Sequence, residues 1–125
     1  MAINKFVEQQ YTNLGGVTTL YGRGTGAGTS TLTGVKGPWV ITRTGTGAYT
    51  ITLNRKYAGL LDFTGTVIDV TTPDDWEVFL AADLTSNNAV SFLVFKGGLA
   101  ADLSTDEKIL LRVVLQDTQA KPAGF

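Results

Sequence analysis

Residues 39–53 restrict the fold more than any other part of the sequence, because two alternating apolar and polar patterns flank a short glycine-containing segment. Alternation with a period of two is typical of half-buried β-strands, so this segment predicts a β-hairpin. Residues directly opposite in an antiparallel pair share a face, which limits the register. The predicted pairs are Trp39 with Leu53, Ile41 with Ile51, and Arg43 with Tyr49.

The predicted register leaves residues 45–47 as a three-residue loop. A loop of this length needs a residue at positive φ in its last position, and Gly47 can adopt that conformation without a Cβ clash. A four-residue loop would place apolar and polar residues on the same face unless a bulge restored the alternation.

The remaining sequence predicts an all-β fold. Threonine and glycine are abundant, whereas alanine, glutamate and lysine are too sparse for long exposed helices. Several short strands separated by turn residues indicate a single-domain β-sandwich or jelly roll. Besides the hairpin, the predicted strands are residues 17–21, 63–70, 76–81, 89–96 and 108–116.

The sequence divides into a glycine- and threonine-rich N-terminal part (residues 1–34), a β-sandwich (35–118) and a tail (119–125). Residues 1–14 have apolar residues at helical spacing, which fits a short amphipathic helix or an extended arm. Either form is a candidate for docking onto another protein. The candidate partner-binding residues of this arm are Ile3, Phe6, Val7, Tyr11 and Leu14.

Two predicted strands carry apolar residues on both faces. In residues 89–96, Leu93 and Phe95 alternate with Val90, Phe92 and Val94. In residues 108–116, Leu110 and Val114 lie among polar neighbours on one face, and the other is the predicted core face, formed by Ile109, Leu111, Val113 and Leu115. A strand of this kind is central in its sheet or lies at a subunit contact. The candidate subunit interface therefore consists of Leu93, Phe95, Leu110 and Val114.

The composition removes several kinds of chemistry. The chain has no cysteine and no histidine, so disulfides, thiolate chemistry and the usual zinc ligands and general base are missing. The ten basic residues are scattered along the sequence, and no basic patch for nucleic acid is visible. No apolar run is long enough for a signal peptide or a membrane span, so we expect a soluble protein made in a cytoplasm.

Three motifs suggest sites, and each has a simpler interpretation. Gly22, Gly24 and Ala27 match a loose dinucleotide pattern, but the following residues are poor helix formers and a flexible loop over residues 22–30 is favoured. The carboxylates of the other two motifs are assigned to solvated turns or caps rather than to acid–base catalysis or calcium binding. These two motifs consist of Asp74, Asp75 and Glu77, and of Asp102, Asp106 and Glu107.

Four aromatic residues form a further candidate site, because aromatic faces stack on the apolar faces of sugars. Aromatic residues that alternate along strands are more often part of the core, which is the favoured interpretation here. The four residues are Trp39, Tyr49, Tyr57 and Trp76.

The hairpin sequence over residues 40–53, with its Arg-x-Gly-x-Gly-x-Tyr pattern, and the ending over residues 106–117 resemble small β-sandwich virion proteins of tailed bacteriophages, of the capsid decoration or cement type. The similarity spans residues 35–118. The resemblance implies a non-enzymatic component without a cofactor, often a homotrimer, that lies on the capsid surface of the virion and binds the major capsid protein.

Two other functions stay open from the sequence. One is a receptor- or glycan-binding module of a phage tail fibre or baseplate, which would use Trp39 or Trp76. The other is a small hydrolase that would depend on Asp75 or Glu77, and it has the least support because no activating base is present. We expect no role in binding nucleic acid or membranes.

Overall fold

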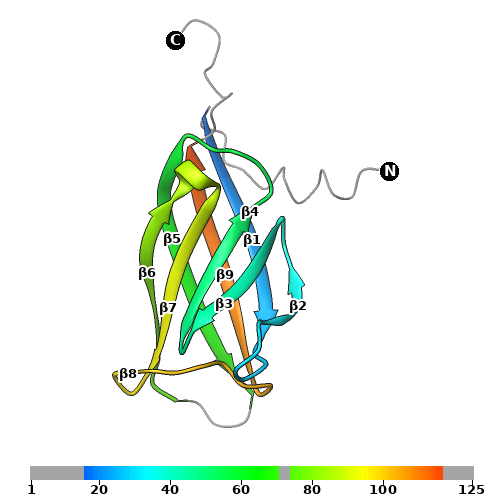
Figure 1. Ribbon diagram of the computed structural model, residues 1–125, viewed down its shortest axis with the longest axis vertical. Coiled ribbons are helices and arrows are strands. Elements are labelled where there is room, and N and C mark those ends of the chain that lie inside the picture. The colour runs from blue at the N-terminus through cyan, green and yellow to red at the C-terminus, as the bar shows by residue number, and fades with distance from the viewer. Residues whose placement is uncertain (1–15, 71–73, 117–125) are drawn as a thin grey trace, which may run out of the picture.

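Two antiparallel β-sheets pack face to face in the computed structural model, which describes residues 16–70 and 74–116 (Figure 1). The first sheet has the strand order β2-β1-β9-β5, with bounds Thr33–Lys36, Val17–Thr25, Glu107–Gln116 and Gly59–Asp69. The second sheet has the order β3-β4-β7-β6, with bounds Trp39–Gly45, Ala48–Leu53, Ala89–Lys96 and Trp76–Leu84, and the short β8 (Leu99–Ala100) pairs with β7. The predicted all-β sandwich is confirmed.

The predicted hairpin register is confirmed by the pairing of β3 with β4, in which Ile41 lies opposite Ile51. The connection differs from the predicted loop, because Gly45 pairs with Ala48 and the register shifts between Arg43 and Gly45. Residues 46–47 are therefore the whole turn, and a bulge restores the alternation of faces. Gly47 has the predicted positive φ of 64°, and a Cβ there would lie 2.6 Å from the carbonyl oxygen of Val94.

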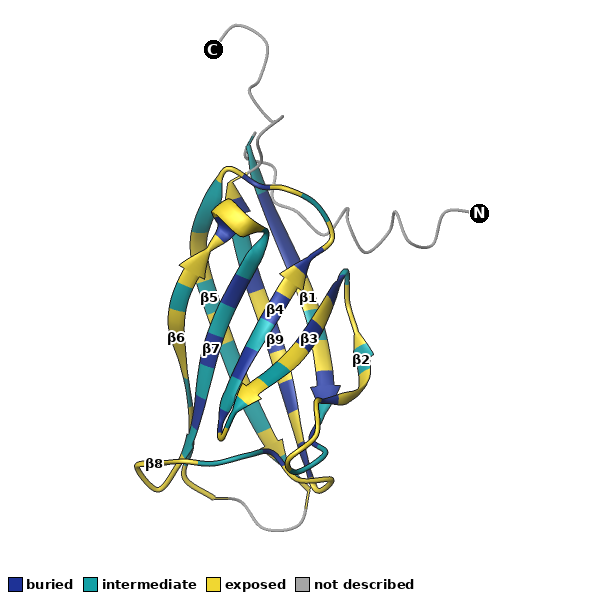
Figure 2. Cartoon of the chain, viewed as in Figure 1, coloured by how far each residue is buried: buried dark blue, intermediate teal, exposed yellow. Residues whose placement is uncertain are grey.

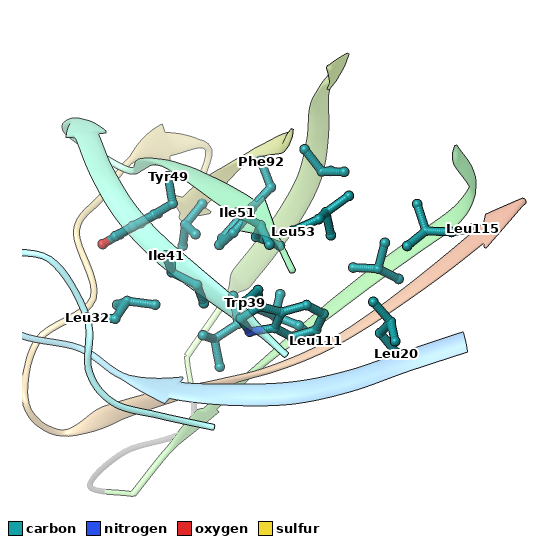
Figure 3. Close-up of a cluster of buried hydrophobic side chains, with 14 of the residues drawn as sticks. Leu20, Leu32, Trp39, Ile41, Tyr49, Ile51, Leu53, Phe92, Leu111 and Leu115 are labelled. Atoms are coloured by element: carbon teal, nitrogen blue, oxygen red, sulfur yellow. The ribbon is translucent and has the colours of Figure 1, made fainter. Parts of the chain in front are cut away.

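The core lies between the sheets and takes one face of every long strand (Figures 2 and 3). Phe92 of β7 is fully buried and stacks on Tyr49 of β4 and on Phe63 of β5, with ring centroids 5.4 and 5.5 Å apart. Because Phe63 belongs to the first sheet, this stack joins the two layers. The predicted core face of β9 is confirmed by the burial of Ile109, Leu111, Val113 and Leu115.

Strand β6 is longer than the predicted residues 76–81, because it continues to Leu84. Trp76 and Val78 pack against the core, but Leu80 is 45% exposed. The register between β6 and β7 shifts between Leu80 and Ala82. Because β6 is an edge strand, this bulge leaves Leu80 at the open side of the sandwich.

The loop predicted over residues 22–30 is wrong in its first half, because β1 continues to Thr25. Gly22 and Gly24 are glycines for a packing reason: a Cβ on Gly22 would overlap the Trp39 ring, and one on Gly24 would lie 3.0 Å from Leu32. Strand β1 thus precedes residue 35, the expected start of the sandwich, and β2 begins two residues before it. An extended strand at Gly22 and Gly24 does not form the phosphate-binding turn of a dinucleotide motif.

The segment between β8 and β9 crosses the lower end of the sandwich and connects the two sheets (Figure 1). Asp102 pairs with Arg43 through two hydrogen bonds of 2.9 Å and accepts a third, of 2.8 Å, from the backbone N–H of Gly47. The next residue, Leu103, is fully buried, and its N–H donates to the hydroxyl of Tyr49. This segment therefore closes the core at its lower end.

We predict that Gly22→Ala lowers the free energy of unfolding by about 1–3 kcal/mol or more, because the added methyl group overpacks the contact with Trp39. The matched control is Gly59→Ala in β5, where no heavy atom lies within 4 Å of the added Cβ and φ is not in the left-handed region. That variant is expected to be neutral or slightly stabilising. Denaturant unfolding measures both changes, and equal losses would contradict the packing role of Gly22.

We also predict a pH-dependent contribution from Asp102. The Arg43 guanidinium lowers the pKa of Asp102, so its stabilising effect is present above the ordinary aspartate pKa and is lost as the pH falls through the lowered value. At neutral pH, Asp102→Ala should lower the free energy of unfolding by about 1–3 kcal/mol, because it leaves the buried N–H of Gly47 without its acceptor. The free energies of unfolding of the wild type and of Asp102→Ala, measured from neutral to acid pH, should differ less as the pH falls. A difference that stays constant over this range would contradict the assignment.

Candidate binding surface

The outer face of the second sheet is almost free of charge. The large outward side chains are Val40, Phe79, Leu84, Leu93 and Phe95, and small residues and threonines fill the space between them. Among the described outward residues that are paired in β3, β4, β6 and β7, only Glu77 is charged. We call this surface the neutral face.

Phe79 and Phe95 form the most prominent feature of the neutral face. Their rings meet edge to face, with centroids 5.5 Å apart. Phe79 is 47% exposed, whereas Trp76 and Val78 on the other face of the same strand pack against the core. Val40, on the opposite edge strand, is 64% exposed. Large apolar side chains exposed at both edges of a sheet face with few charged residues are typical of a surface that contacts another protein.

The outer face of the first sheet has a different character. The strand pairings place Arg23 directly opposite Lys36 and bring Lys108 and Arg112 of the neighbouring β9 onto the same side. Among the described residues paired in this sheet, Asp62 is the acidic residue on this side, and it accepts a hydrogen bond of 2.8 Å from Nη2 of Arg112. We call this surface the basic face.

The basic face contains an open groove of about 280 Å³ over the central strand β9. Tyr21 of β1 lies on one side of the groove, and Thr64 and Thr66 of β5 lie on the other. Tyr21 and Leu110, which both line the groove, are 50% and 42% exposed.

The four predicted interface residues do not form one patch. Leu93 and Phe95 lie on the neutral face, whereas Leu110 and Val114 lie on the basic face, on the opposite side of the sandwich. A contact between these two opposite sides would stack copies in a row, whereas a closed ring requires surfaces at an angle to each other. The five predicted arm residues, Ile3, Phe6, Val7, Tyr11 and Leu14, lie outside the described residues.

The predicted carboxylate motifs take part in local contacts at the lower end of the sandwich. The backbone N–H of Asp75 and then the ammonium of Lys96, 3.1 Å away, lower the pKa of Asp74. Glu107 accepts hydrogen bonds from the N–H and hydroxyl of Ser104, as expected for a capped turn. Within residues 16–70 and 74–116, no group of three or more carboxylates is placed to hold a metal ion.

The four aromatic residues do not form an exposed platform. Trp39, Tyr49 and Tyr57 are at most 7% exposed. Trp76 is partly buried, its Nε1 lies 3.4 Å from Asp69, and the Lys96 ammonium lies 5.3 Å from the centroid of its ring. The favoured interpretation therefore holds, because three of these aromatic residues are buried in the core and Trp76 packs against it.

The basic face is the feature that the sequence did not reveal. Its cations come from β1, β2 and β9, and the sequence separation between Arg23 and Arg112 hides their proximity. The local signal was the spacing of Lys108 and Arg112, which places both on the side of β9 opposite the core. Assigning Arg23 and Lys36 to the same face also required the strand order.

Comparisons with protein-family models, with curated proteins and with solved structures find no match to this chain. In the part of the chain that the structure describes, no helix is long and apolar enough to cross a membrane.

Proposed function

We propose that this protein is a structural component of a tailed-bacteriophage virion, a capsid decoration protein that binds the outside of the head shell and stabilises it. The observation that carries the proposal is the neutral face, with Phe79, Leu93 and Phe95 on a sandwich that already has a complete core. The resemblance of residues 40–53 and 106–117 to decoration proteins supports the particular role.

The neutral face has the composition of a protein contact. Protein interfaces are depleted of charged residues at their centres and enriched in aromatic ones. The paired Phe79 and Phe95 lie on a face whose described, paired residues include a single acidic one. In the proposed role, this face contacts the major capsid protein. Many copies on one shell add their individual affinities, so each contact need not be strong.

The proposal includes two further elements that follow from the resemblance and the sequence. The protein is a homo-oligomer, with a trimer favoured, and the apolar residues of the N-terminal arm contribute to anchoring.

A glycan-binding module is less well supported, because the burial of Trp39, Tyr49 and Tyr57 removes most of the aromatic surface that it would use.

We predict that Phe79→Lys reduces binding to coat-protein shells at least about tenfold, because it places a charge in the apolar contact that Phe79 and Phe95 form. Co-sedimentation with shells measures the bound fraction. The matched control is Ile68→Lys, which introduces the same charge on an edge strand of the other sheet at a residue 42% exposed. Equal binding of the wild type and Phe79→Lys would contradict a role for the neutral face.

Deletion of residues 1–14 tests the arm separately. We expect the deletion to abolish shell binding while the far-ultraviolet circular dichroism and thermal midpoint of the sandwich are retained, since the described core begins after Gly16. Unchanged occupancy on the shell would refute the anchoring role of the arm. Absence of shell binding by the wild-type protein would refute the proposed function as a whole.

A further inference from the structure

We infer that the basic face is a second binding surface, and that its groove takes an acidic peptide segment of a partner protein. In this arrangement an apolar side chain of the peptide lies over Leu110 beside Tyr21, and flanking carboxylates reach Arg23, Lys36 and Lys108. This inference does not depend on the proposed virion role, which uses the opposite face of the sandwich.

Two cations of the basic face have an unfavourable arrangement. Arg23 and Lys36 are directly opposite each other in the antiparallel pair of β1 and β2, and like charges in this position destabilise a sheet. Both side chains are exposed, and no carboxylate of the described residues forms an ion pair with either of them or with Lys108. A bound carboxylate would convert this repulsion into attraction.

The face already contains one example of the recognition that we infer. Arg112 donates from Nη2 to the Asp62 carboxylate at 2.8 Å and to the hydroxyl of Thr64 at 3.2 Å. An arginine beside a threonine on the outer face of this sheet thus binds a carboxylate within the chain. Arg23 and Lys108 lie on the same face without such an intramolecular partner among the described residues.

The groove indicates a peptide with an apolar residue rather than a purely electrostatic contact. Leu110 is exposed apolar surface at its centre, Tyr21 adds an exposed ring on one side, and the hydroxyls of Thr64 and Thr66 offer hydrogen bonds along the other side. Tyrosine and arginine are the residue types enriched at energetically important positions of protein interfaces. Cations around an apolar centre therefore match a segment in which acidic residues surround an apolar one.

The same observations disfavour nucleic acid as the occupant. The whole chain has a net charge of -1 and an isoelectric point near 5.2, whereas nucleic-acid-binding domains are usually strongly basic. A single exposed aromatic residue in the groove provides no row of stacking surfaces for successive bases. A short acidic peptide, by contrast, can be attracted by the few cations of the basic face alone.

The test uses the full-length protein and a blocked synthetic peptide of sequence Glu-Glu-Leu-Glu-Glu, with binding followed by amide chemical shifts. We expect saturable changes centred on Tyr21, Leu110 and Arg112, and affinity that falls with added salt. The double variant Arg23→Gln/Lys36→Gln should bind roughly tenfold more weakly, because two exposed ion pairs are lost. The control Lys56→Gln removes an exposed cation elsewhere and should bind as the wild type does.

Peptide and stability controls separate the parts of the inference. Replacing the peptide leucine by glycine should weaken binding if the groove is used, and replacing its glutamates by glutamine should abolish it. Lys36→Gln alone should raise the thermal midpoint slightly, because it removes the repulsion with Arg23. The thermal midpoint of the double variant, measured in the same way, shows that its loss of binding is not loss of folding.

Three results would overturn the inference. They are the absence of saturable peptide binding by the wild type, equal weakening by Lys56→Gln and by the double variant, and tighter binding of an oligothymidylate of the same charge than of the peptide. None of these measurements involves coat-protein shells. Failure of the basic-face inference and failure of the proposed decoration role are therefore distinguishable.

Discussion

The stack of aromatic rings around Phe92 is the interaction on which the rest of the structure depends. Phe92 contacts Tyr49 within its own sheet and Phe63 in the other sheet, so it fixes how the two layers face each other. The hydroxyl of Tyr49 in turn accepts the N–H of Leu103 and so positions the segment that closes the lower end of the core. Aromatic pairs of this geometry add stabilisation beyond their buried area.

The features that the sequence predicted correctly are those set by neighbouring residues in one or two strands. Alternation alone identified the core face of β9 and the pairing of Ile41 with Ile51, because a slip of one residue would turn every buried side chain toward solvent. The bulge before Gly45 was not predicted, since a two-residue turn and a three-residue loop are both compatible with the same register.

The features that the sequence missed depend on contacts between distant segments. Gly22 and Gly24 have the composition of a flexible loop, and only the approach of Trp39 and Leu32 explains why a strand carries glycine there. The basic face was missed for a related reason. Its cations become neighbours only when β1 is placed between β2 and β9, and the strand order is not encoded in the spacing of residues along any single strand.

Alternation also explains how one small sandwich can carry two chemically different surfaces. Strands β7 and β9 are central in their sheets, so their inward residues are committed to the core while Leu93 and Phe95, or Leu110 and Arg112, are free of that constraint. Although the net charge is only -1, the charged side chains are unevenly distributed, with a basic face on one side of the sandwich and a neutral face on the other. Since the core lies between them, substitutions on one outer face can change binding there with little effect on the other face or on the packing of Phe92.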